Sequence, residues 1–257
     1  MNHAVHRLPV EHRYGAARDQ VADLWRPSGT PEARPVVVVI HGGFWRTRYG
    51  KGLMHGLCLA LVRLDYCVWN IEYRRLGPRS GGGWPTTLED VAAAIDALQG
   101  IEGVDCSKVV TCGHSAGGHL ALWAAARDRL PPGMPGASPG VRVGAAVSLA
   151  GVSDLVAGAT LGRGAAAELL GGEPGEVPER YAAASPFASL PLGVPQLLVH
   201  GDADTTVPCA QSERYVARAQ ALGDPARLLV VPRAGHFAVI NPCSSAWQAT
   251  LAAFPEL

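Results

Sequence analysis

Short apolar runs alternate with helical patterns along the chain, and this alternation limits the possible folds more than any other feature. Residues 36–40 are Val and Ile alone, which is typical of a strand buried on both faces. Similar runs lie at 66–71, 109–112, 143–149, 196–200 and 228–231, and helical patterns lie at 52–64, 85–98, 115–127, 209–222 and 244–254. We predict an α/β fold with a mostly parallel central sheet and helices on both faces. The carboxyl ends of the parallel strands then share one edge, where ligands bind.

Three stretches depart from this rhythm, and one of them is a loop rich in Gly, Pro and Arg at 77–83. The segment up to Arg34 can hold one or two edge strands, around 11–15 and 20–25. The stretch 152–192 is rich in Gly, Ala and Pro, and it follows a predicted strand at the ligand-binding edge. Long excursions there often have a function, so we expect short helices that form a small lid. The alternative is a surface loop without contact to substrate. We expect a single domain over 1–257, with 152–192 as the lid insertion.

Charge and cysteine content exclude several classes of partner. The 22 basic and 22 acidic side chains cancel, so no basic field attracts nucleic acid or an anionic membrane. The six cysteines show no Cys-x-x-Cys spacing, and no metal or other cofactor is implied. Residues 1–9 lack the apolar core of a signal peptide, and no run approaches the about 20 apolar residues that span a bilayer. We expect a cytoplasmic protein with free thiols and a small-molecule substrate. The sequence does not indicate an oligomeric state.

The segment 109–118 reads Val-Val-Thr-Cys-Gly-His-Ser-Ala-Gly-Gly, a strand pattern that leads through Gly-x-Ser-x-Gly into a helical pattern. A serine nucleophile projects from such a strained strand-to-helix turn, where Gly113 and Gly117 avoid clashes. At the start of the helix, the dipole and the free amides favour developing negative charge near Ser115. The alternative is a Gly-rich turn in which Ser only caps a helix. The strand before it and the helix after it favour Ser115 as a nucleophile.

The second motif, His-Gly-Gly-Phe-Trp at 41–45, follows the strand 36–40 directly. Acyl transfer needs two backbone amides that bind the oxygen of the tetrahedral intermediate, one after the nucleophile and one from such a loop. We expect the amides of Gly43, Phe44 and Ala116 to form this oxyanion hole, with His41 as an anchor. Phe44, Trp45 and His114 are expected to contact substrate, and Trp45 is as well suited to core packing.

The base and the acid should follow Ser115 along the chain, in the order acid and then His. His119 lies one turn into the helix that Ser115 opens, and His200 ends an apolar run, so His236 is predicted as the base. The loop after residue 200 offers two carboxylates. Asp204 lies deeper in the loop and is the preferred acid, whereas Asp202 is the alternative and could hold the turn by side-chain hydrogen bonds.

Together these residues resemble the α/β-hydrolase superfamily. His-Gly-Gly-Phe-Trp looks like the His-Gly-Gly-x-Trp of kynurenine-formamidase-like hydrolases. Hormone-sensitive-lipase-like esterases usually have a third glycine where this chain has Phe44. The segment His-Gly-x-x-Asp-x-x-Val-Pro, from His200 to Pro208, resembles the acid loop of prolyl-oligopeptidase-like domains, which supports Asp204 over Asp202. The resemblance implies the α/β-hydrolase fold and a Ser-Asp-His triad. The chain has no room for the propeller of those peptidases.

The expected activity is a serine hydrolase that cleaves a carboxylic ester or amide through an acyl-enzyme on Ser115. An aryl formamide is one candidate substrate, motivated by the 41–45 motif alone. Three alternatives stay open. The same triad could serve an acyltransferase or thioesterase, a small peptidase could use it, or the chain could be a binding protein on a hydrolase fold.

Overall fold

The computed structural model describes residues 8–29 and 34–254. Residues 1–7, on which most of the signal-peptide expectation rests, lie outside the described residues. The described residues form one sheet in the order β1-β2-β4-β3-β5-β6-β7-β8. Its strands are β1 (Val10–Arg13), β2 (Val21–Trp25), β3 (Arg34–Ile40), β4 (Cys67–Ile71), β5 (Val104–His114), β6 (Ala145–Leu149), β7 (Gln196–Gly201) and β8 (Ala226–Val231).

The sheet is parallel from β4 to β8, and an antiparallel edge is added by the first two strands. The β1–β2 and β2–β4 pairs are antiparallel, and every other pair is parallel. The two edge strands expected in the first segment are β1 and β2. The predicted α/β fold with a mostly parallel sheet is therefore confirmed.

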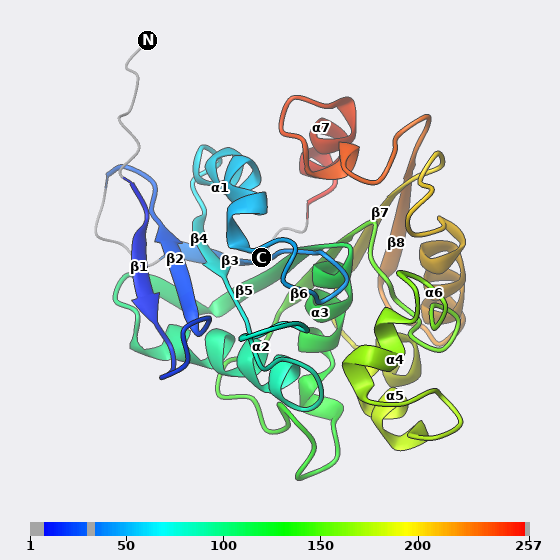
Figure 1. The fold of residues 1–257 in the computed structure, drawn as a ribbon. Coiled ribbons are helices and arrows are strands. Elements are labelled where there is room, and N and C mark those ends of the chain that lie inside the picture. Colours follow the sequence, from blue (N-terminus) through cyan, green and yellow to red (C-terminus); the bar gives the residue numbers. More distant parts are fainter. Residues whose placement is uncertain (1–7, 30–33, 255–257) are drawn as a thin grey trace.

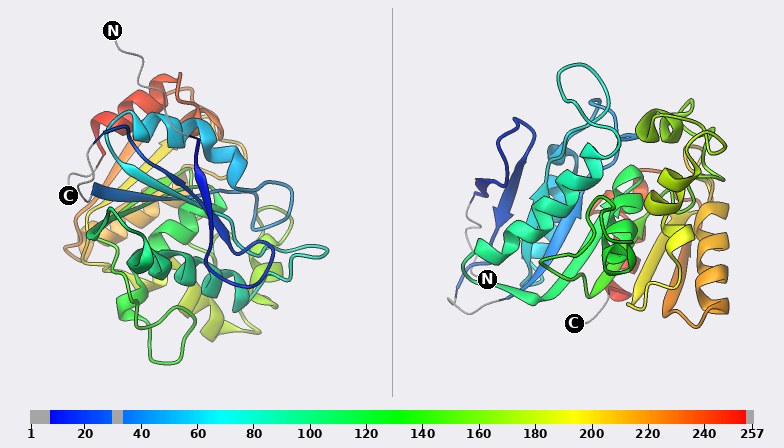
Figure 2. Two further views of the ribbon diagram at one scale, coloured as in Figure 1. Left: turned by 90° about the vertical axis from the view of Figure 1, so that its left-hand side faces the viewer. Right: turned by 90° about the horizontal axis from the view of Figure 1, so that it is seen from below.

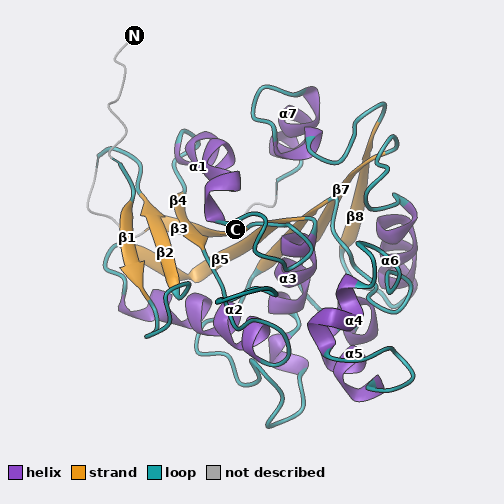
Figure 3. Cartoon of the chain, in the orientation of Figure 1, coloured by secondary structure: helices purple, strands orange, loops and turns teal. Residues whose placement is uncertain are grey.

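Helices cover both faces of this sheet (Figures 1 and 3). In Figure 1, α1 and α7 lie above the sheet and α2, α3 and α6 lie below it. The helices are α1 (His55–Val62), α2 (Thr86–Asp96), α3 (Ala116–Ala125), α4 (Ala165–Leu170), α5 (Pro178–Ala184), α6 (Ala210–Ala221) and α7 (Ser245–Ala252).

Strand β3 shows why the all-apolar runs were informative. Successive side chains of a strand point to opposite faces of the sheet. Val36, Val38 and Ile40 accordingly join the core beneath α2 and α3, and Val37 and Val39 join the core beneath α1 and α7. All five are fully buried, so the strand has no polar face.

Strand β5 is longer than its apolar run 109–112. It begins at Val104, because Arg34 and Pro35 pair with Val104 and Asp105 before the register shifts at Val36. The added residues are largely polar and none is buried, so no hydrophobic pattern marks them in the sequence. This extension leaves the other end of β5, where Ser115 follows, unchanged.

The stretch 152–192 folds into α4, α5 and a short turn of helix at Pro186–Ser189. The right-hand view of Figure 2 shows α4 and α5 on the same edge of the molecule as the loops after β3 and β4. Within residues 8–29 and 34–254, no helix combines the length and the apolar character that crossing a bilayer requires.

Candidate active site

Ser115 lies at a sharp turn between β5 and α3. Its φ of 57° and ψ of −120° are strained for a residue with a side chain. The turn is tied to the sheet, because the Ser115 amide donates to the Leu149 carbonyl of β6 at 2.8 Å. The Ser115 carbonyl then accepts the first helical hydrogen bond from the His119 amide at 3.1 Å. The structure thus places the predicted nucleophile at the start of α3, only 2% exposed.

Close backbone packing explains the glycines around this turn. A Cβ at Gly113 would lie 2.0 Å from the Gly117 carbonyl oxygen, so the backbone before and after the turn approaches too closely for a side chain. A Cβ at Gly42 would lie 2.9 Å from the Ser115 Cβ. The 41–45 loop therefore rests directly against Ser115, as an oxyanion loop must.

The loops that hold the predicted acid and the predicted base follow β7 and β8 and meet at the same edge. His236 Nδ1 lies 2.7 Å from Asp204 Oδ2, and both side chains are nearly or fully buried. A carboxylate accepts, so His236 Nδ1 carries the hydrogen and Nε2 is left to take a proton. Asp202 is exposed and accepts from the Arg233 amide. The geometry therefore pairs Asp204, not Asp202, with His236.

Asp204 is held in its ionised form. Burial would raise its pKa, but hydrogen bonds from His200, His236 and the Val207 amide lower the pKa well below its usual range. His200 also lies at 2.9 Å from the Val207 carbonyl and at 2.8 Å from the Ser212 hydroxyl. His200 is thus a buried support of the acid loop, as its position at the end of an apolar run suggested.

His114 joins the turn at Ser115 to the base loop. Its Nε2 donates to the His236 carbonyl at 2.9 Å, and the two rings lie 4.6 Å apart. Burial and the nearby charge of His236 lower the pKa of His114 to about 3, so its ring is neutral at ordinary pH. His114 is 1% exposed. Its predicted contact with substrate remains a prediction.

The peptide planes of the 41–45 loop are fixed by two contacts. The Gly42 carbonyl faces His41 Nδ1 at 2.8 Å, and the Gly43 carbonyl accepts from the Arg46 amide at 3.0 Å. In a trans peptide the N–H points opposite to the carbonyl. The amides of Gly43 and Phe44 therefore point away from these partners. Ala116, the third predicted donor, is the first residue of α3.

Trp45 is not at the mouth of a pocket, in contrast to the prediction that it contacts substrate. It is 2% exposed and belongs to the core on the α3 side of the sheet. Its indole N–H donates to His119 Nδ1 at 3.2 Å, and the two rings meet edge to face. Its φ of 56° turns the chain so that the indole packs inward. The buried N–H needs a partner, and His119 supplies one.

Phe44 of the same loop instead packs against the 152–192 segment. A Cβ at Gly162 would lie 2.5 Å from the Phe44 ring, so Gly162 packs flat against it. Arg46, which follows the loop, makes a second contact with this segment. Its guanidinium pairs with Glu168 of α4 at 2.5 Å and donates to the Gly162 carbonyl at 2.7 Å. The 152–192 segment thus contacts the predicted oxyanion loop, as a lid over the site would.

A pair of glycine variants tests this lid contact. Gly162 and Gly164 both have a positive φ, 58° and 74°, so an alanine costs a similar backbone strain at either position. Only at Gly162 does the new methyl group meet Phe44; nothing lies within 4 Å at Gly164. We expect Gly162→Ala to lower kcat/KM on small esters by about tenfold through a displaced Phe44 ring. Gly164→Ala should keep the wild-type kcat/KM, and equal losses in steady-state assays of both variants would contradict a role for Phe44.

Two aromatic rings near His236, one exposed and one half-buried, were not predicted from the sequence. Phe237 follows His236, is 48% exposed and contacts the His236 ring edge to face at 5.3 Å. Tyr49 lies 6.2 Å from Phe237 and packs against Gly43. Phe237 could have been predicted from the sequence, because it directly follows the predicted base. Nothing in the sequence placed Tyr49 near it, because the two belong to loops far apart along the chain.

Comparison with known proteins identifies the family of this chain. The BD-FAE family model matches residues 22–218. The chain belongs to the BD-FAE family. Esterase LipQ of Mycobacterium tuberculosis is 31% identical to this BD-FAE chain over 216 residues, which cover 79% of the chain and 51% of LipQ. Kynurenine formamidase of Danio rerio is 28% identical over 116 residues, 45% of the chain and 38% of that protein.

The fold recurs in solved structures. A truncated form of a carbohydrate esterase from gut microbiota superposes on this BD-FAE chain with a TM-score of 0.82 and 23% identity, covering 98% of the chain and 97% of that structure. The predicted membership in the α/β-hydrolase superfamily is confirmed. The chain spans about half the length of the curated relatives it matches, 51%, 49% and 55% for the first three.

Proposed function

We propose that this chain is a serine hydrolase that cleaves a carboxylic ester through an acyl-enzyme. His236 Nε2 removes the hydroxyl proton of Ser115 as Oγ attacks the ester carbonyl. The amides of Gly43, Phe44 and Ala116 stabilise the oxyanion. When the tetrahedral intermediate collapses, His236 gives the proton to the leaving alcohol. Water, deprotonated by His236, then releases the acid and restores Ser115.

The observation that carries this proposal is the Asp204–His236 pair, which His114 joins to the strained turn at Ser115. The 2.7 Å hydrogen bond fixes the tautomer in which His236 Nε2 can accept a proton. The ψ of −120° and φ of 57° at Ser115 are costly for a serine. Binding alone requires neither feature, so together they favour an enzyme over the binding-protein alternative.

The substrate is proposed to be a small ester with an apolar part. Phe44, Tyr49 and Phe237 flank the predicted triad, so an apolar acyl or leaving group would find aromatic contacts there. The formamide alternative rested on His-Gly-Gly-Phe-Trp, and the Trp of that motif packs in the core. Its remaining support is the partial similarity to kynurenine formamidase.

A panel of substrates tests the proposed function. Purified enzyme should hydrolyse p-nitrophenyl acetate or butyrate with a rapid burst of p-nitrophenol equal to the amount of enzyme, whenever deacylation is slower than acylation. N-formylkynurenine, a peptide anilide and an acetylated sugar complete the panel. Activity on the formamide with none on any ester would show that the substrate is an amide and not the proposed ester. No turnover of any member would contradict the proposal. Transfer of the acyl group to an added alcohol in preference to water would favour an acyltransferase.

A further inference from the structure

His114 is the last residue of β5 and lies between the predicted oxyanion loop and the loop that holds the predicted base. Its backbone pairs with Leu149 of β6, so the ring projects from a fixed point of the sheet. Its Nε2 lies 2.9 Å from the His236 carbonyl. A carbonyl can only accept, so Nε2 carries a hydrogen and donates it. The base loop is therefore bonded, through its own backbone, to the residue before the predicted nucleophile.

The opposite edge of the His114 ring rests on the oxyanion loop. A Cβ at Gly42 would lie 3.3 Å from His114 Nδ1 and 2.6 Å from the His114 carbonyl oxygen. Within the part of the chain that the structure describes, Nδ1 is buried and has no hydrogen-bond partner. A hydrogen on Nδ1 would add a charge and an unpaired donor in this buried place, and both are costly. The contact therefore requires an unprotonated Nδ1 and a residue without a side chain at position 42.

The low pKa of His114 agrees with this contact. Burial is its main cause, and the neighbouring His236 and His200 lower the pKa further, to about 3. The hydrogen bond to the His236 carbonyl and the charge of Asp204 raise the pKa, but they offset the effect of burial only in part. The ring of His114 therefore keeps its neutral form at the pH values where an ordinary histidine titrates.

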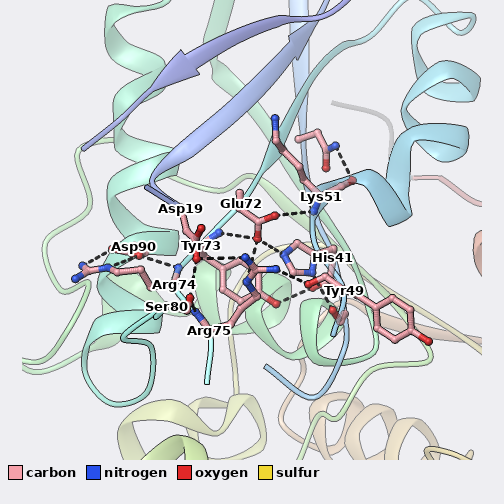
Figure 4. A network of polar contacts seen from close by, with 12 residues as sticks. Asp19, His41, Tyr49, Lys51, Glu72, Tyr73, Arg74, Arg75, Ser80 and Asp90 are labelled. Atoms are coloured by element: carbon pink, nitrogen blue, oxygen red, sulfur yellow. Dashed lines mark hydrogen bonds and ion pairs between the residues drawn. The ribbon is translucent and has the colours of Figure 1, made fainter. Parts of the chain in front are cut away.

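Gly42 is fixed in place, because a separate network holds the peptide that precedes it (Figure 4). The Tyr73 hydroxyl donates at 2.9 Å to the His41 carbonyl, which belongs to the peptide that joins His41 to Gly42. The His41 ring stacks on Tyr73 at 4.5 Å with 9° between the planes, and its Nε2 lies 2.8 Å from Glu72 Oε1. All three side chains of this network are buried. The His114 ring thus rests against a fixed surface.

We propose that the His114 ring is a spacer that positions the base relative to the oxyanion loop. One edge of the ring rests on Gly42 and the other holds the His236 carbonyl, so the ring sets the distance between the two loops. This distance matters because His236 Nε2 must reach Ser115 Oγ while the substrate oxygen lies at the amides of the oxyanion hole. His114 is a positioning residue, and this role rests on the proposed function.

Two substitutions of equal length separate the hydrogen bond from the packing. In His114→Gln, the amide nitrogen can take the place of Nε2 and donate to the His236 carbonyl, whereas His114→Met fills the space without a donor. We expect His114→Met to lower kcat by about 10- to 100-fold with KM nearly unchanged, because a base displaced by about 1 Å slows the reaction to this extent. His114→Gln should recover most of that loss.

Steady-state assays of the two variants decide between hydrogen bonding, packing and substrate contact. A folded His114→Met enzyme with the wild-type kcat would overturn the proposal. Equal losses of kcat in both variants would also overturn it, because the N–H donor would then have no part in the effect. A raised KM with an unchanged kcat would show that His114 contacts substrate and does not position the base.

The state of the His114 ring can be measured without turnover. In ¹⁵N-labelled wild-type protein at about pH 5, where an ordinary histidine is protonated, Nδ1 of His114 should still give the ¹⁵N shift of an unprotonated nitrogen. A protonated Nδ1 would overturn the proposal even if neither variant folds. An unprotonated Nδ1 in a wild-type protein that cleaves no ester would support the contact with Gly42 and contradict the proposed function.

Discussion

Ser115→Ala should lower kcat/KM for the best ester substrate by roughly a millionfold. The triad acts as a unit, so removing its nucleophile leaves only the rate that binding and the oxyanion hole supply. An alanine at this turn meets the same backbone strain as the serine, so the free energy of unfolding should change by no more than about 1 kcal/mol. Steady-state assays and chemical denaturation of one preparation measure both quantities.

The matched control lies on the same strand. Ser107 is exposed near the opposite end of β5, where its hydroxyl donates to Asp105. Ser107→Ala should keep the wild-type kcat/KM. A Ser115→Ala enzyme that works at a rate comparable with this control would remove Ser115 from the mechanism.

Asp204→Asn should lower kcat by about 10,000-fold. The amide cannot replace the carboxylate, because it no longer fixes the His236 tautomer or stabilises the imidazolium that forms during attack. The control is Asp202→Asn, two residues away. Asp202 accepts from the Arg233 amide and is exposed, so its variant should keep nearly full kcat. A large loss in Asp202→Asn with a small one in Asp204→Asn would reverse the assignment of the acid.

The same carboxylate links stability to pH. The pKa of Asp204 in the folded protein lies well below the unfolded value of about 3.9. Its stabilising contribution is therefore complete above that pH and is lost as the pH falls toward the folded pKa. The unfolding free energy of Asp204→Asn should accordingly fall less steeply below about pH 4 than that of wild type. Denaturant titrations across this range measure the difference.

Local patterns predicted the elements that carry the site. Each parallel strand has an apolar run, because helices cover both faces of the sheet. Ser115, Asp204 and His236 each lie in a segment that follows one of these strands. Both aspartates lie in the same short loop, so the choice of Asp204 over Asp202 depended on its deeper place in that loop and on a resemblance. The structure separates them: one is buried against His236, and the other is exposed.

Contacts between segments far apart in sequence could not be predicted. Glu72 follows β4 as a lone acidic residue, and only the β3–β4 register brings it to His41. For Trp45 the sequence left contact with substrate and core packing equally open, and the partner of its buried N–H, His119, lies far along the chain. The start of β5 was missed because its polar residues form a strand only through pairing with Arg34 and Pro35.

Covalent labelling tests most directly whether Ser115 is an activated nucleophile. Wild-type enzyme treated with a fluorophosphonate should gain the mass of one adduct, and peptide mapping should place it on Ser115. The adduct should be absent from Ser115→Ala and form far more slowly in Asp204→Asn, while Ser107→Ala and Asp202→Asn label like wild type. An unlabelled wild-type enzyme, or an adduct on another residue, would contradict the assignment of Ser115.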